Sequence, residues 1–400
     1  MTFDSASSAP STEPAFRPLE GVRVLDLTRV LAGPYATMSL AELGADVVKV
    51  EMPGIGDETR IWGPPFVDTS SAYFHAVNRG KRSIAIDLSS EAGQATAEKL
   101  LASSDVVVEN FRPGVPERLG LAASDVMARH PHLVYASITG FGRTGPMAAE
   151  AGTEVIVEAE SGLMSITGVP DGEPVRFGVA MVDIATGLTM VNGVLAALLE
   201  RTRTGRGRRI DVSLYATALS SLGTVIASAS AGGGSPRSWG SAHPSIVPYR
   251  AFRATDGHVV LGATNDAMFQ RLVASLELAE QLGGAEWAGN ADRVAGRDLL
   301  ESFVQDAVGQ LTVDEVLARL RAHRVLVAPV LSPDEAARSE QARALGVVVD
   351  EGGVLVARGP LVAGRPDGLG PAPGLGEHTD EILAELASEH GSFEIQEVAR

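Results

Sequence analysis

Hydrophobic and polar positions along the chain form a pattern that predicts strands separated by helices. Residues 22–27 are apolar and β-branched, which is typical of a buried strand, and a helix-like stretch at residues 36–43 follows and ends at Gly44. Further strands are expected at residues 46–50, 83–87, 105–109, 133–138 and 209–214. Helical periodicity lies between them at residues 91–102, 124–129 and 183–203. Strands that alternate with helices predict an α/β fold with a doubly wound, Rossmann-like parallel sheet.

The amino-acid composition of the chain changes after residue 227. Small residues continue to residue 241 and include three successive glycines at 232–234, which is typical of a linker. Two strands at 249–252 and 258–261, joined by a turn at Asp256-Gly257, begin a smaller α+β domain. Helical patterns follow in it at 267–276 and 299–321, and a strand at 325–329. A last helix is expected at 379–387. We therefore predict five segments: a disordered tail at 1–18, a large Rossmann-like domain at 19–227, a linker at 228–241, a small domain at 242–330, and a return segment at 331–400 that packs on the large domain.

Composition excludes several classes of protein. The 33 Lys and Arg residues against 50 Asp and Glu residues give a net charge of −17, which argues against a nucleic-acid partner because such binding depends on neutralising phosphates. The chain has no cysteine, so thiolate catalysis, cysteine-ligated zinc and disulfides are excluded. The first 17 residues lack the basic start and apolar stretch of a signal peptide, and no unbroken apolar run reaches about 18 residues. We expect a cytoplasmic protein with no membrane partner.

The common cofactor and catalytic motifs are missing. Residues 28–34, which follow the first strand, lack the glycine spacing that seats a dinucleotide, and the chain contains no phosphate-binding loop that ends in Gly-Lys-Ser/Thr. It also has no His-Glu-x-x-His and no Gly-x-Ser-x-Gly, so neither a metal site nor a serine hydrolase elbow is expected. Carboxylates, Lys, Tyr, Ser and Thr are the groups left for covalent chemistry.

A series of short motifs resembles the family III CoA-transferases, also called the CaiB/BaiF family, over about residues 19–385. The motifs lie at residues 27–35, 43–51, 78–83, 109–114, 139–142, 161–164, 182–183, 204–207, 243–244, 248–249 and 255–257. The resemblance implies an acyl-CoA transferase that acts on an acyl-CoA and a small carboxylic acid, with no cofactor besides coenzyme A. It also implies an interlocked homodimer.

Asp183 is the residue that the resemblance identifies as the catalytic nucleophile. In the family's transferases an aspartate in this segment attacks the acyl-CoA thioester, forms a mixed anhydride and then an aspartyl-CoA thioester, and the acceptor acid takes CoA by the reverse steps. The residues alone also allow a second interpretation, in which Asp183 caps the long helix that follows it. The two roles are compatible, because a helix N-terminus stabilises a carboxylate.

Glu154 is the second catalytic candidate, because formyl-CoA transferase-like sequences also carry a glutamate there. It could raise the pKa of Asp183 or position the acceptor acid, or it could be an ordinary charge at a helix N-terminus. The neighbouring Thr153 occupies the position where the α-methylacyl-CoA racemases have a histidine, and threonine cannot shuttle protons near neutral pH. A racemase or isomerase, or a CoA-binding protein without turnover, is the alternative.

The phosphates of CoA require cations and polar groups in the binding groove. The candidates for these contacts are Arg60, Lys81, Arg82, Asn110, Arg112 and Arg118. The sequence departs from formyl-CoA transferase at Leu31 and Met52, where that enzyme has Gln and Arg. This departure argues against formyl-CoA and oxalate as substrates.

Overall fold

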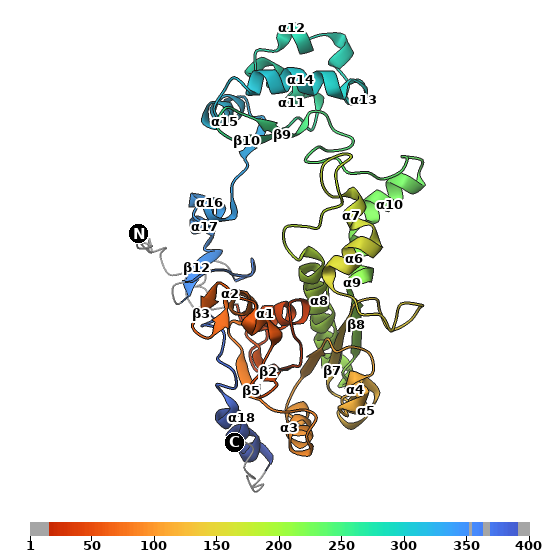
Figure 1. Cartoon of the computed structure of the whole chain (residues 1–400), viewed down its shortest axis with the longest axis vertical. Helices are drawn as coiled ribbons and strands as arrows, with labels where there is room; N and C mark the ends of the chain where they lie inside the picture. The colour runs from red at the N-terminus through yellow and green to blue at the C-terminus, as the bar shows by residue number, and fades with distance from the viewer. Residues whose placement is uncertain (1–15, 352–353, 363–368, 391–400) are drawn as a thin grey trace. The chain divides into compact units, whose positions relative to one another are not determined.

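The computed structural model describes residues 16–351, 354–362 and 369–390, and these group into two compact units (Figure 1). Of the described residues, the first unit contains 16–163, 177–232 and those from 340 to 390, whereas the second contains residues 164–176 and 233–339. Three features differ from the prediction: residues 164–176 belong with the smaller unit, the predicted linker at 228–241 is divided between the two units after residue 232, and the smaller unit continues to residue 339. The predicted tail at 1–18 lies mostly outside the described residues, and the predicted homodimer stays a prediction.

The core of the first unit is a parallel sheet of six strands in the order β5-β2-β1-β6-β7-β8. In chain order these are β1 (Arg23–Asp26), β2 (Asp46–Glu51), β5 (Arg82–Ala85), β6 (Val106–Glu109), β7 (Val134–Thr139) and β8 (Arg209–Ser213). The predicted α/β fold with a parallel sheet is thus confirmed. From β1 the chain builds the sheet first toward β5 and then, from β6, in the opposite direction. In such a sheet ligands bind at the carboxyl ends of the strands where the order reverses, here β1 and β6.

Helices cover both faces of this sheet, as a doubly wound fold requires. α1 (Ala32–Glu42) packs against α8 (Met181–Thr204), and α8 also contacts β7 and β8. On the other face, apolar residues of α3 (Glu91–Ala102), α5 (Ala123–Arg129) and α18 (Thr379–His390) join the buried side chains of the strands in one core. Within the described part of the chain, α8 is the one helix long and apolar enough to cross a membrane, and in the first unit it packs against α1, α9 (Leu214–Ser221) and two strands of the sheet.

The start of α1 differs from the prediction, because the helix begins at Ala32 and not at residue 36. Pro34 lies in the first turn, where a missing N–H costs nothing. Gly33 packs so closely on Thr28 that an added Cβ would lie 2.3 Å from the Thr28 Cβ. Gly33 and Pro34 therefore both belong to the first helical turn.

The remaining elements of the first unit are short. They are η1 (Glu58–Ile61), β3 (Phe66–Val67), β4 (Ser70–Ser71), α2 (Ala72–Asn78), α4 (Val115–Arg118), α6 (Glu154–Ser161), α9 (Leu214–Ser221), α10 (Gly223–Ser230), α17 (Glu340–Leu345), β12 (Val348–Glu351) and β13 (Val354–Ala357). α7 (Leu163–Ile166) lies where the chain passes into the second unit.

The second unit is built on a small antiparallel sheet of three strands in the order β11-β10-β9. Its elements are β9 (Tyr249–Arg253), β10 (His258–Gly262), α11 (Asp266–Ser275), α12 (Ala279–Leu282), η2 (Ala285–Trp287), α13 (Asn290–Ala295), α14 (Arg297–Val308), α15 (Val313–Ala322), β11 (Leu326–Pro329) and α16 (Pro333–Ala337). The helical pattern predicted at 299–321 is two helices, because α14 ends at Val308 and Thr312 starts α15 with a capping box to Glu315. The expected α+β character is confirmed.

Candidate active site

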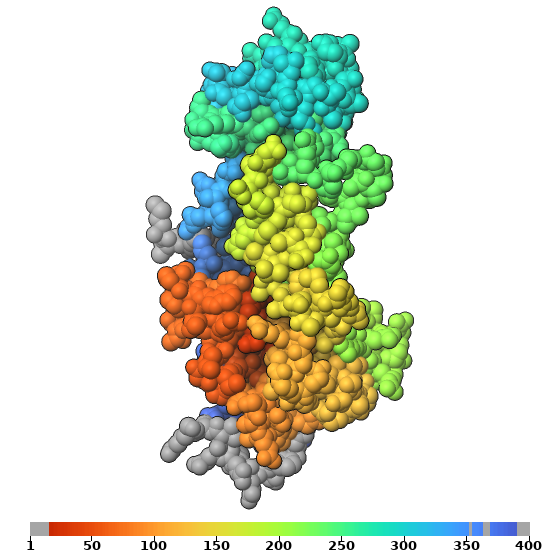
Figure 2. All heavy atoms as spheres, turned by 45° about the vertical axis from the view of Figure 1, so that its right-hand side comes forward, coloured from red at the N-terminus to blue at the C-terminus, as the bar shows by residue number. Residues whose placement is uncertain are grey.

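A cavity of about 440 Å³ lies in the first unit at the carboxyl ends of β1, β6 and β7. Its walls are the loops that follow these strands, at residues 29–32, 110–113 and 138–142, together with residues 148–154, Glu58, Asp183 and Leu214. On the face shown in Figure 2, the orange residues after β6 lie directly beside the yellow residues of the α6 region. The cavity thus occupies the place where the strand order reverses.

Asp183 lines this cavity from the first turn of α8. The helix begins at Met181 after Ala180, and no side chain caps it at that residue, so the interpretation of Asp183 as a helix cap is wrong. Burial raises the pKa of Asp183 to about 6, while the first turn of a helix favours a negative charge. At neutral pH the carboxylate is mostly ionised and only partly hydrated, which is the state in which it can attack a carbonyl carbon.

Glu154 is the first residue of α6, is buried and lines the same cavity. Its Oε1 accepts a hydrogen bond from the backbone N–H of Val182 at 3.0 Å. Because Val182 immediately precedes Asp183, this contact ties the start of α6 to the turn that carries the candidate nucleophile. Glu154 is thus a charge at a helix N-terminus, as the alternative interpretation held, but it is buried and also contacts the turn that carries Asp183. The raised pKa of Asp183 has burial as its cause.

Asn110 joins the loop after β6 to the loop after β1. Its Oδ1 accepts from the backbone N–H of Arg29 at 3.0 Å, and its Nδ2 donates to the carbonyl of Arg29 at 2.8 Å. Asn110 and Arg112 both line the cavity, so two of the six predicted CoA contacts lie where a ligand could reach them. Arg29 lines it too and was missed by the sequence analysis, although its place directly after a strand of a parallel sheet was a usable signal.

A second set of hydrogen bonds and ion pairs, around Glu109, joins the end of β6 to the loop after β7. Glu109 accepts from the Nη2 of Arg143 at 2.8 Å and from the backbone N–H of Phe111 at 2.8 Å. Ser137 contacts both charged groups, and Arg143 also binds Asp211 at 2.6 Å. Burial raises the pKa of Glu109 although these donors oppose the shift. The end of β6 and the loop after β7 are thus fixed to each other beside the cavity.

The other predicted CoA contacts, Arg60, Lys81, Arg82 and Arg118, are absent from the described lining of this cavity. The buried Arg60 guanidinium donates to Glu51 at 2.8 and 2.6 Å and lies 3.8 Å from the ring centroid of Phe74. Arg118 is exposed at the end of α4.

Lys81 and Arg82 are likewise engaged in ion pairs. The Lys81 ammonium is fully buried and donates to Asp26 at 2.9 Å, to Asn78 at 2.8 Å and to a backbone carbonyl. Burial lowers the pKa of Lys81 to about 8, although Asp26 partly opposes the shift. Arg82 forms ion pairs with three carboxylates, those of Asp46, Glu381 and Glu385. Contact of Arg60, Lys81 and Arg82 with CoA stays a prediction that their ion pairs do not favour, and contact of Arg118 with CoA stays a prediction.

Similarity to known proteins identifies the family of this chain. The model of CoA-transferase family III matches residues 19–379. The chain belongs to this family. The succinyl-CoA:glutarate CoA-transferase of Mus musculus is 42% identical over 388 residues, which cover 95% of this chain and 89% of the relative. The succinate–glutarate CoA-transferase of Agrobacterium fabrum is 40% identical over 382 residues, covering 92% of this chain and 96% of the relative.

A solved structure supports the same assignment. The crystal structure of a CaiB/BaiF family protein from Brucella suis has a TM-score of 0.85 and 40% identity, and the match covers 92% of this chain and 99% of that one. The predicted resemblance is confirmed: this family III member is a CoA-transferase, and CoA is its substrate. Among the residues that the structure describes, no group of three or more His, Asp and Glu side chains is placed to hold a metal ion.

Proposed function

We propose that this CoA-transferase moves CoA from an acyl-CoA to a carboxylic acid through covalent intermediates on Asp183. The observation that carries the proposal is the position of this carboxylate, which lines the cavity at the strand-order reversal. Burial raises its pKa to about 6, so it is ionised at neutral pH and retains nucleophilic character.

The reaction requires two anhydrides and one thioester. A carboxylate oxygen of Asp183 attacks the thioester carbonyl, the carbon–sulfur bond breaks, and CoA leaves as a thiolate. The thiolate attacks the aspartyl carbon of the anhydride and releases the donor as a carboxylate, which leaves an aspartyl-CoA thioester. The acceptor carboxylate attacks this thioester and displaces the thiolate, and the thiolate then attacks the acceptor's acyl carbon. Asp183 is regenerated as a carboxylate, and no proton is gained or lost.

We propose a dicarboxylic acid as the acceptor. The names of the two relatives pair succinate and glutarate, and both of these acids have two carboxyl groups. Transfer between such acids exchanges one thioester for another of similar energy. The racemase alternative has little support, because Thr153 lines the cavity and no histidine is part of the described lining.

Chemical trapping tests the nucleophile. The wild-type protein is incubated with succinyl-CoA, quenched with hydroxylamine, and its peptides are analysed by mass spectrometry. We expect a hydroxamate on Asp183 and loss of both the label and transfer in Asp183→Ala. The exposed Asp306 on α14 supplies the control, because Asp306→Asn should leave the label in place. Transfer without a label, or a label confined to Glu154, would overturn the assignment.

A further inference from the structure

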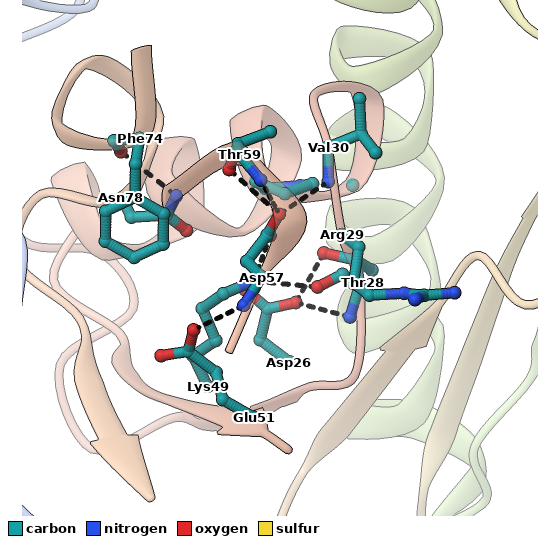
Figure 3. Close-up of polar contacts among 12 residues, drawn as sticks. Asp26, Thr28, Arg29, Val30, Lys49, Glu51, Asp57, Thr59, Phe74 and Asn78 are labelled. Atoms are coloured by element: carbon teal, nitrogen blue, oxygen red, sulfur yellow. Dashed lines mark hydrogen bonds and ion pairs between the residues drawn. The ribbon is translucent and has the colours of Figure 1, made fainter. Parts of the chain in front are cut away.

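Arg29 is an unpaired cation at the wall of the cavity that contains Asp183 and Glu154. Its side chain is exposed, and in the described part of the chain its guanidinium has no hydrogen bond and no ion pair. Figure 3 shows this side chain extending away from the polar cluster that surrounds its own loop. Arg112 is the other arginine of the cavity, and it lies after β6 in the segment that the family resemblance assigns to CoA.

The backbone around Arg29 is held by the side chains of Asp26 at the end of β1, Lys49 in β2 and Asn110 after β6. The N–H of Thr28 donates to Asp26 at 2.9 Å, and the carbonyl of Thr28 accepts from Lys49 at 2.7 Å. Asn110 binds both the N–H and the carbonyl of Arg29. The loop therefore has little freedom, although its arginine side chain is free.

Val30, the next residue, adds backbone strain to this arrangement. Its φ is 72°, in the left-handed region that a β-branched residue rarely adopts. Its N–H faces Oδ1 of Asp57 at 3.4 Å, and Asp57 is paired with Lys49 at 3.0 Å, with both side chains fully buried (Figure 3). Strained conformations of this kind persist only where the surroundings over-determine them, and they cluster at ligand sites.

We infer that Arg29 binds the second carboxylate of the dicarboxylic acid, the one that does not react with Asp183. The inference rests on the proposed function and assigns the residue that selects the acceptor. A guanidinium matches a carboxylate with two parallel hydrogen bonds, and a preorganised loop lowers the entropy cost of forming them. The cavity already contains the carboxylates of Asp183 and Glu154 in a chain of net charge −17, so a dianion needs a local cation.

Arg29→Met tests this role with two acceptors of equal chain length, glutarate and pentanoate. We expect kcat/KM for glutarate to fall about 10- to 100-fold, as for loss of a charged hydrogen-bond pair, whereas kcat/KM for pentanoate changes less than about threefold. In a ping-pong reaction this acceptor kcat/KM is independent of the donor concentration. Arg29→Lys should give an intermediate preference for glutarate, because it keeps the charge and loses the fork.

Two further measurements distinguish binding of the second carboxylate from an effect of net charge and from a role in CoA binding. The exposed Arg206 in the turn after α8 is the control for net charge, and Arg206→Met should leave both acceptors unaffected. The Kd of free CoA should be the same for Arg29→Met and wild type. Equal losses with both acceptors, or weaker CoA binding, would overturn the inference and assign Arg29 to a shared part of the site.

Failure of the proposed function can be distinguished from failure of the Arg29 assignment. If wild-type protein transfers CoA to neither acid, the proposed function is wrong, and calorimetric titration with glutarate and pentanoate then decides the role of Arg29. Tighter binding of glutarate that disappears in Arg29→Met supports the inference. Equal binding of the two acids by the wild type overturns it.

Discussion

The carboxylate of Glu154 accepts a hydrogen bond from the backbone N–H of Val182, 3.0 Å away on a different helix. Val182 lies in the first turn of α8, where N–H groups have no partner within the helix. Glu154 supplies one of the missing partners from the start of α6. The position of Asp183, the next residue along α8, therefore depends on a side chain that is remote in sequence.

Substitution of Glu154 separates positioning from charge. Glu154→Gln keeps an acceptor oxygen for Val182, so we expect kcat to fall less than about fivefold, whereas Glu154→Ala leaves a buried N–H unpaired and should lower kcat about 10- to 100-fold. Steady-state kinetics with glutarate measure both values. The exposed Glu160 lies on the same helix, and Glu160→Ala should have no effect. Equal losses in the Gln and Ala variants would show that the negative charge itself is needed.

Asp183 should make stability depend on pH. Its pKa is about 6 in the folded protein against 3.8 as the ordinary value, so the native state binds the proton more tightly and loses stability as pH rises between these values. At pH 7.5 the ionised carboxylate should cost about 1–3 kcal/mol. We expect Asp183→Asn to be inactive but more stable by this amount at pH 7.5, with the gain fading toward pH 4. Urea denaturation at several pH values measures it, and a gain independent of pH would contradict the cause.

Lys49 should be essential for the fold around the cavity. Its ammonium is fully buried against Asp57 and near Asp26. Burial alone would raise the pKa of Asp26, but Lys81, Lys49 and the Thr28 hydroxyl hold it well below its usual range. Lys49→Met leaves these carboxylates undercompensated, so we expect the free energy of unfolding to fall by about 3–5 kcal/mol.

Urea denaturation measures the loss of stability in Lys49→Met, and two further variants serve for comparison. Lys49→Met combined with Asp57→Asn removes both charges of the pair and should recover part of the loss. Lys99→Met on the partly exposed α3 should change stability by less than about 0.5 kcal/mol. A loss no larger than that of Lys99→Met would show that water or proton uptake already compensates the buried acids.

The strands and the longer helices could be predicted because their apolar periodicity is strong. α3 has the predicted bounds, since Ser90 caps its first turn through Gly93. The start of α1 was missed because Gly33 and Pro34 oppose a helix locally, whereas packing on Thr28 and the first-turn position of proline favour it. These effects depend on tertiary neighbours that local periodicity does not contain.

The candidate site could be predicted only in part, because the sequence does not show which tertiary neighbours a charged residue has. Asp183, Asn110 and Arg112 lie in motifs, Glu154 has a counterpart in formyl-CoA transferase-like sequences, and all four line the cavity. Lys81 also lies in a motif and Arg60 was a further candidate, but their charges are neutralised by Asp26 and Glu51. A sequence shows a charge without its partner, so it cannot distinguish a buried ion pair from a cation that is free to bind a phosphate.

The route of the chain has a consequence for how such a protein can be rebuilt. It enters the second unit between α6 and α8, returns, and enters it again after residue 232. The second unit therefore cannot be exchanged between relatives as one cassette, because residues 164–176 would have to travel with it. A chimaera joined at a single position between residues 164 and 339 would divide that unit between two parents, and the shorter insert would have to be transplanted from between the helices that carry Glu154 and Asp183.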